Sequence, residues 1–160
     1  MIVNEALNGG ESHVTAVGDW SANDAVELLL TQDFTAAQLM GYTFGDSPDQ
    51  TTQKSTAWRL SGLEAIAATF RAGTLITVRG PLHAEDLNYT PMATGTDDQW
   101  NLLLTPAGGH VTLVEGSVPN GFEVAPHNEV LWVDSAHTGL SDLNVTHGVA
   151  WDDPATHQVG

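Results

Sequence analysis

The feature of this sequence that most constrains its fold is a series of short apolar runs separated by turn-forming residues. The runs are rich in valine, leucine, threonine and aromatic residues, and glycine, aspartate, asparagine and proline recur between them. Such runs are typical of β-strands, and many of them favour two packed sheets over one open sheet, because packing limits exposed edges. The runs are IVNEAL, AVELLL, GYTFG, TAWRL, TLITVRG, WNLLLT, HVTLVEG, VLWVD and VTHGVAWDD. The sequence therefore predicts an all-β, two-sheet sandwich with tryptophans as core anchors.

One segment, residues 63–70, has the apolar spacing of a helix instead. Its sequence, LEAIAATF, places apolar side chains on one helical face, namely Leu63, Ile66, Ala67 and Phe70. Because the segment is short, we expect one short helical insert between strands.

Two further segments have the composition of connections between strands. Residues 106–110, PAGGH, lie between two strand runs, and we expect a hairpin turn in which glycine supplies a positive φ. Residues 81–99 are polar, acidic and contain proline. We expect them to form a long surface loop, the part of a sandwich that often carries binding residues.

The length and charge of the chain bound its organisation and its partners. A chain of 160 residues without an internal linker is predicted to form one domain over residues 1–160. Twenty acidic residues oppose four basic ones, which gives a net charge of -16. Such a surface repels nucleic-acid phosphates and anionic lipid headgroups. The expected partner is therefore a protein or another copy of the chain, and not nucleic acid.

The apolar runs are too short for a membrane span. None approaches the roughly 18 residues that cross a bilayer, so we expect no membrane insertion. The first residues, MIVNEALNGG, lack the basic and apolar regions of a signal peptide. Either an export signal has been removed, or the protein reaches its site without one.

The polar residues form no recognisable catalytic motif. The histidines lack H-x-H or H-E-x-x-H spacing, and Ser21, Ser61 and Ser117 lie outside a G-x-S-x-G context. Surface or turn positions are expected for the histidines, which are His13, His83, His110, His127, His137, His147 and His157. A small acid-dependent hydrolase remains an alternative, in which a loop acid such as Asp97 or Asp98 acts with a histidine.

The sequence leaves calcium binding open. The adjacent aspartates at 97–98 and 152–153, together with Asp46 and Asp49, offer oxygen ligands, but no D-x-[DN]-x-[DN]-G loop is present. We expect no cofactor and no metal site. A calcium-dependent carbohydrate-binding module or adhesin is kept as a second alternative.

The order of several runs resembles a known family. IVNEALNG is followed by DAVELLLTQDFTAAQLMGYTFGDS, then by AWRL, FRAGTLITVRG and WNLLLTPAGGHVTL. This order, over about residues 2–114 with THGVAWDD as a closing strand, is similar to the lamin tail domain family in its bacterial or viral-type forms. The resemblance implies an immunoglobulin-like sandwich that acts as a non-enzymatic recognition or assembly module.

The resemblance also assigns structural roles to five residues. Asn4, Glu5, Glu27, Gly41 and Asp46 match family positions that shape strands and turns. Glu27 interrupts an apolar run, and a buried unpaired carboxylate is costly, so we expect its carboxylate to face solvent or a backbone donor. No catalytic residue is expected.

These inferences lead to one expected function. The chain is expected to mediate protein–protein assembly or adhesion on the outside of a cell surface, a filament or a viral particle. Strand edges, apolar loop residues and acidic patches would form the contacts.

Overall fold

A computed structural model describes residues 1–7, 25–47, 56–80, 83–91, 99–116, 129–141 and 145–151. These residues form mostly strands with very little helix, which confirms the predicted all-β class. The strands are β1 (Ile2–Leu7), β2 (Ala25–Leu29), β3 (Phe34–Thr35), β4 (Thr43–Ser47), β5 (Ala57–Leu60), β6 (Thr69–Phe70), β7 (Leu75–Arg79), β8 (Asn101–Leu104), β9 (Val111–Glu115), β10 (Glu129–Asp134) and β11 (His147–Trp151). The helical elements are α1 (Ala36–Leu39) and the 3-10 helix η1 (Leu63–Ala65).

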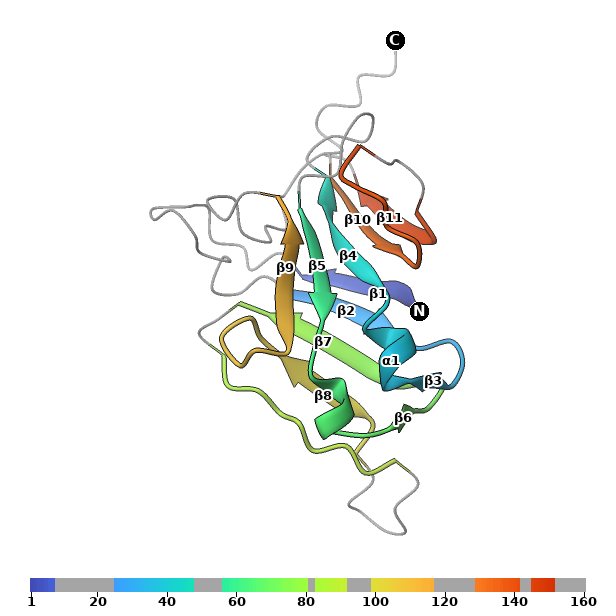
Figure 1. Ribbon diagram of the computed structural model, residues 1–160, viewed down its shortest axis with the longest axis vertical. Coiled ribbons are helices and arrows are strands. Elements are labelled where there is room, and N and C mark those ends of the chain that lie inside the picture. Colours follow the sequence, from blue (N-terminus) through green and yellow to red (C-terminus); the bar gives the residue numbers. More distant parts are fainter. Residues whose placement is uncertain are drawn as a thin grey trace.

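The strands form two layers and a small two-stranded ribbon (Figure 1). The four-stranded sheet has the order β1-β2-β7-β8, and the five-stranded sheet has the order β11-β10-β4-β5-β9. This arrangement confirms the predicted two-sheet sandwich, and the strand orders β1-β2-β7 and β11-β10-β4 are those of A-B-E and G-F-C in an immunoglobulin sandwich. The fold departs from that pattern in β8, which runs parallel to β7, and in β5 and β9, which extend the second sheet beyond β4.

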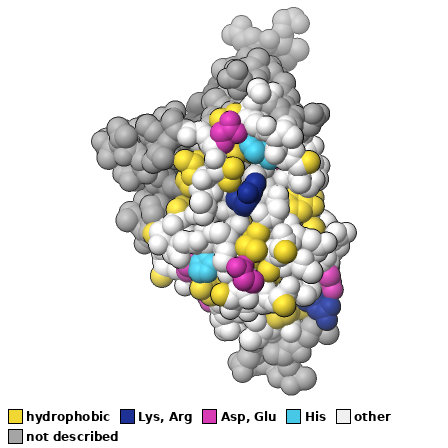
Figure 2. Space-filling model, in the orientation of Figure 1, with side chains coloured by type: hydrophobic (Ala, Val, Ile, Leu, Met, Phe, Trp, Pro, Cys, Tyr) yellow, Lys and Arg dark blue, Asp and Glu magenta, His cyan; other side chains and the backbone are white. Residues whose placement is uncertain are grey.

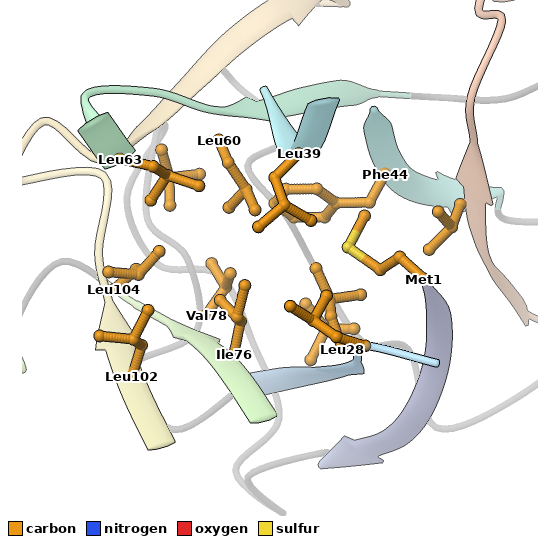
Figure 3. Close-up of a cluster of buried hydrophobic side chains, with 14 of the residues drawn as sticks. Met1, Leu28, Leu39, Phe44, Leu60, Leu63, Ile76, Val78, Leu102 and Leu104 are labelled. Carbon is orange, nitrogen blue, oxygen red and sulfur yellow. The ribbon is translucent and has the colours of Figure 1, made fainter. Parts of the chain in front are cut away.

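The core lies between the two sheets. Figure 3 shows Leu28, Ile76 and Val78 of the four-stranded sheet pointing toward Phe44 and Leu60 of the five-stranded sheet. These side chains are at most 1% exposed. Because burial of one such side chain is worth about 1.5–3 kcal/mol, the alternating inward positions hold the layers together. Trp58 also packs in this core, as expected for a tryptophan anchor.

The short helix lies elsewhere than predicted. In the segment 63–70 a single 3-10 turn forms at Leu63–Ala65, and Thr69–Phe70 pairs as β6 with β3. Leu63 and Phe70 are both fully buried, so the predicted apolar face exists although the backbone is not a continuous helix. The α-helix is α1, which begins at a capping box between Thr35 and Gln38. That signal, Thr-x-x-Gln, is readable in the sequence.

The predicted hairpin at residues 106–110 is wrong, because β8 and β9 belong to different sheets. The segment carries the chain from one layer to the other, and Gly109 does have the expected positive φ of 86°. The predicted loop at residues 81–99 is also more ordered than expected. Asp86 and Leu103 form an antiparallel bridge, so part of this segment lies along β8. The intervening residues 92–98 lie outside the described ranges.

Candidate functional site

Three of the five expected residues meet on the outer face of the four-stranded sheet. Glu5 lies directly opposite Glu27 in the β1–β2 register, and the register shifts between Val3 and Glu5. Asn4 lies at this irregularity, and its Nδ2 donates to Oε1 of Glu27 at 2.5 Å. The carboxylate of Glu27 thus lies in an exposed hydrogen bond, as the expected solvent-facing position allows, and its donor is a side-chain amide instead of a backbone group. Two carboxylates placed opposite each other repel, and the amide gives one of them a partner.

The other two expected residues lie in different regions. Gly41 follows α1, and its N–H donates to the carbonyl oxygen of Gln38 at 3.1 Å. Asp46 is 6% exposed, and the hydroxyl of Thr56 donates to its carboxylate. The indole N–H of Trp132 donates to the backbone oxygen of Asp46 at 3.1 Å. The five residues thus do not converge on one site, and each described contact is internal to the sandwich.

A partly buried histidine–carboxylate pair lies where the chain crosses between the sheets. Oε2 of Glu85 is 2.8 Å from Nδ1 of His110, and Oε1 accepts the N–H of Thr105 at 2.9 Å. The side chains are 12% and 17% exposed, respectively. A Cβ on Gly108 would lie 1.9 to 2.2 Å from Cδ and the two oxygens of the Glu85 carboxylate. Glycine at this position therefore leaves the space that the carboxylate occupies. The pair joins the 83–91 segment to the crossover.

This pair resembles the histidine–acid half of a hydrolase triad, and Ser61 lies nearby. The N–H of Ser61 donates to the backbone oxygen of His110 at 2.9 Å. Its hydroxyl, however, donates to the carbonyl oxygen of Gly109 at 2.7 Å and lies 3.1 Å from the Thr112 hydroxyl. A nucleophilic serine must instead bond to the imidazole. The observed hydrogen bonds fasten the crossover to the end of β5.

A second histidine–carboxylate pair lies on the outer face of the five-stranded sheet. The residues after β10, 135–141, turn back over this face, and His137 stacks on Trp132 with ring centroids 5.8 Å apart and an interplanar angle of 16°. Nε2 of His137 is 3.3 Å from Oε2 of Glu115 on β9. Trp132 lies opposite Gly45, where a Cβ would come within 2.7 Å of the indole. The same Cβ would lie 2.0 Å from the backbone oxygen of Thr56, so glycine at this position allows both the Thr56 backbone and the indole to approach β4.

Beside this pair lies an arginine without an acidic partner. Arg59 is on β5 between the inward residues Trp58 and Leu60, so its side chain projects from the outer face. Its Nε is buried and has no hydrogen-bond partner, and the same is true of Nδ1 of His137. Figure 2 looks onto this face and shows few charged side chains, among which a basic group, a histidine and an acid lie close together.

Arg71, unlike Arg59, is paired with an acid, which is the ordinary state of an arginine in an acidic chain. Its Nη1 is 2.7 Å from Oδ2 of Asp33, and both side chains are about half exposed, at 51% and 49%. The N–H of Ala72 donates to Oδ1 of the same aspartate at 2.9 Å. The backbone hydrogen bond from Ala72 and the hydrogen bond from Arg71 lower the pKa of Asp33 below its ordinary value.

The structure changes the expectation for two histidines and two acids. His110 follows the turn at residues 106–109 and His137 lies in the connection after β10, as the predicted surface or turn positions allow, but their side chains are only 17% and 5% exposed. Asp46 and Asp134 are buried, at 6% and 4% exposed. Both acids have donors: the N–H of Ala136 donates to Oδ1 of Asp134 at 2.9 Å, and Thr56 donates to Asp46. No local sequence signal identifies these residues, because each partner is distant in the sequence or lies in a turn.

Several candidates lie outside the described residues. They are Asp49, Asp97, Asp98, Asp152, Asp153, Ser21, Ser117, His13, His127 and His157. Within the described ranges, no three histidine or acidic side chains gather closely enough to hold a metal ion. No helix in the same ranges is long and apolar enough to cross a membrane.

Comparison with known proteins finds no relative of this chain. No family model, no curated protein and no solved structure matches this chain. The resemblance to the lamin tail domain family therefore stays a prediction.

Proposed function

We propose that this chain is a non-enzymatic assembly module that associates with further copies of itself. The setting that we propose is the outside of a cell, a filament or a viral particle. The resemblance to lamin tail domains and the immunoglobulin-like sandwich both support a module of this kind, although a fold alone hosts many functions. The specific support comes from how the polar groups of the described residues are used.

The proposal rests on a contrast between polar groups that have internal hydrogen-bond partners and polar groups that have none. The pairs that could perform chemistry are held in internal contacts: Glu85 binds both His110 and a backbone N–H, and Ser61 bonds away from the imidazole. The side chain of Arg59 has no hydrogen-bond or ion-pair partner among the described residues, and its Nε, like that of Arg79, is buried and unpaired, although acids outnumber bases twenty to four in the chain. An arginine left unpaired in so acidic a protein is suited to an acid on a neighbouring molecule.

The charge of the chain sets how such assembly depends on salt. Two copies that each carry -16 repel one another over distances beyond contact. Added salt shortens the range of this repulsion, from about 10 Å at 0.1 M to about 3 Å at 1 M, and affects desolvated short-range contacts much less. Association should therefore strengthen as salt rises. The same property suits a protein that works in a saline medium.

Sedimentation velocity tests the proposal directly. We expect the mean mass to rise with protein concentration, over about 5–500 µM, and to rise further when NaCl increases from about 0.1 M to 1 M. A single monomeric species under all these conditions would refute the proposed function. Parallel runs with millimolar calcium and with EDTA separate it from the calcium-dependent alternative, which requires association or melting temperature to change on adding calcium.

A further inference from the structure

The four sheet edges of the sandwich are not equally protected. The edge strands β1 and β11 lie against each other, and the N–H of Val3 on β1 donates to Nδ1 of His147 on β11 at 3.2 Å. Strand β8 is flanked by the 83–91 segment, where Asp86 and Leu103 exchange N–H···O bonds of 2.9 and 3.0 Å. Among the described residues of the two large sheets, none forms a β-bridge with the outer edge of β9.

Strand β9 has the composition of an edge that can accept another strand. Its sequence, VTLVE, is β-prone and free of proline and lysine, two residues that commonly block edge pairing. Its register with β5 shifts at Val114, between the pairs Trp58–Leu113 and Ala57–Glu115, and this irregularity places Glu115 on the same face as Thr112. Val114 is 41% exposed, one of the most exposed large apolar side chains in the described part of the molecule. An uncovered edge of this kind is a template for strand addition.

The charges around β9 are arranged with both signs on one face. Arg59 lies on the neighbouring strand, opposite Thr112 in the register. Glu115 lies at the far end of β9, opposite Ala57 on the same outer face, and is 46% exposed. Its bond to His137 is long, at 3.3 Å, so the carboxylate is not tightly held. One copy therefore has an unpaired cation on β5, beside Thr112 of β9, and a loosely held anion at the Glu115 end of β9.

We propose that two copies pair their β9 strands antiparallel about a two-fold axis, and that Arg59 of each copy binds Glu115 of the other. An antiparallel arrangement brings the Glu115 end of one β9 toward the Val111 end of the next, which lies near Arg59. The two side chains are then separated by about two strand spacings, roughly 10 Å between backbones, a span that arginine and glutamate bridge together.

A second copy fits this edge better than an unrelated partner. A two-fold interface is self-complementary, so each charge present at one end of the edge finds its opposite on the other copy. The pairing would form one continuous sheet from both five-stranded sheets. This inference rests on the proposed function and names the surface through which assembly occurs.

Charge reversal at the two ends of the edge tests the pairing. We expect Arg59→Glu to weaken self-association at least about tenfold, because it places two carboxylates together at each end. Glu115→Arg should weaken it to a similar extent. The double variant Arg59→Glu/Glu115→Arg restores opposite charges across the axis, and its association constant should return to within about threefold of the original protein.

Arg71→Glu is the matched control, since it makes the same change in net charge away from β9. It should leave association within about threefold of the original protein. A fifth variant, Val114→Lys, tests the edge independently, because an exposed lysine blocks strand pairing without disturbing the core. Circular dichroism and melting curves verify that every variant is folded.

The outcomes separate the two proposals. If the protein associates but Arg59→Glu and Arg71→Glu behave alike, or if the double variant is not rescued, the β9 interface is wrong while the proposed function stands. If the original protein never associates, the proposed function itself fails.

Discussion

The two histidine–carboxylate pairs of this sandwich differ in how fully their atoms are satisfied. In the pair formed by Glu85 and His110, the distance is 2.8 Å, and the second carboxylate oxygen accepts a backbone N–H. In the pair formed by Glu115 and His137, the distance is 3.3 Å, Glu115 is 46% exposed, and Nδ1 of the histidine is buried without a partner. The first pair joins two segments of the backbone; the second leaves a carboxylate able to change partners.

This difference shows why a histidine beside an acid is weak grounds for catalysis. The pair with the better geometry is the one enclosed by the crossover and used to hold it. The looser pair lies next to Arg59, whose side chain is unpaired, and to the edge of β9, with which no described residue pairs. Interaction with another molecule is therefore more consistent with the second pair than with the first.

The largest expected effect comes from removing the carboxylate of Glu85. We expect Glu85→Ala to lower the free energy of unfolding by about 2–4 kcal/mol, because the Thr105 N–H and the His110 imidazole lose their acceptor. Urea denaturation measures the change. The control Glu64→Ala alters an exposed acid and should change stability by less than about 0.5 kcal/mol. Equal effects of the two substitutions would show that the pair does not hold the crossover.

A second test concerns Gly108, which leaves room for this carboxylate. Gly108→Ala should cost about 1–3 kcal/mol, since the new methyl group would displace the Glu85 carboxylate. In the Glu85→Ala background the same substitution should cost less than about 0.5 kcal/mol, because the obstructed group is absent. An unchanged cost in that background would place the effect in the backbone instead.

The looser pair predicts a smaller effect with a different dependence on side-chain shape. His137→Ala should destabilise the protein by about 1–2 kcal/mol through loss of the stacking contact with Trp132. His137→Phe keeps an aromatic ring and removes the unpartnered nitrogen, so it should change stability by less than about 0.5 kcal/mol. If Phe is as damaging as Ala in thermal denaturation, the bond to Glu115 matters more than the stack.

The exposed pair of Asp33 and Arg71 gives the smallest effect and is sensitive to pH. The pKa of Asp33 is lowered in the folded protein by the Ala72 N–H and then by Arg71. Its contribution to stability is therefore fully present above the ordinary value of 3.8 and is lost as the pH falls through the lowered folded value. The stability difference between the protein and Asp33→Asn, measured in urea from neutral pH downward, should shrink in acid. A difference that grows in acid would contradict the sign.

The sequence predicted strands better than it predicted the contacts between them. All nine predicted runs contain a strand of the sandwich, because apolar and β-branched composition is a local property. The 63–70 segment misled because its spacing, with Leu63 and Phe70 both buried, suits a helix as well as a bent connection. The pairing of Phe70 with Phe34 in β3 and β6 depends on a partner 36 residues away, which no local pattern reveals.

The candidate site was accessible to sequence reasoning only in part. Asn4 and Glu27 were singled out, and the structure brings them into contact. Arg59, Glu85 and Glu115 were not, since what distinguishes them is the presence or absence of a partner distant in the sequence. An arginine within the strand run TAWRL, in a chain with four bases, was the one signal available.

The distribution of the strands along the chain has a consequence for biosynthesis. The four-stranded sheet draws on residues up to Leu104, whereas its opposing layer needs β9, β10 and β11, which end at Trp151. During translation, one layer is therefore complete while three strands of its cover have yet to leave the ribosome. During that interval the apolar inner face of the nascent sheet is exposed to water. A chaperone that recognises extended apolar segments would bind to this face.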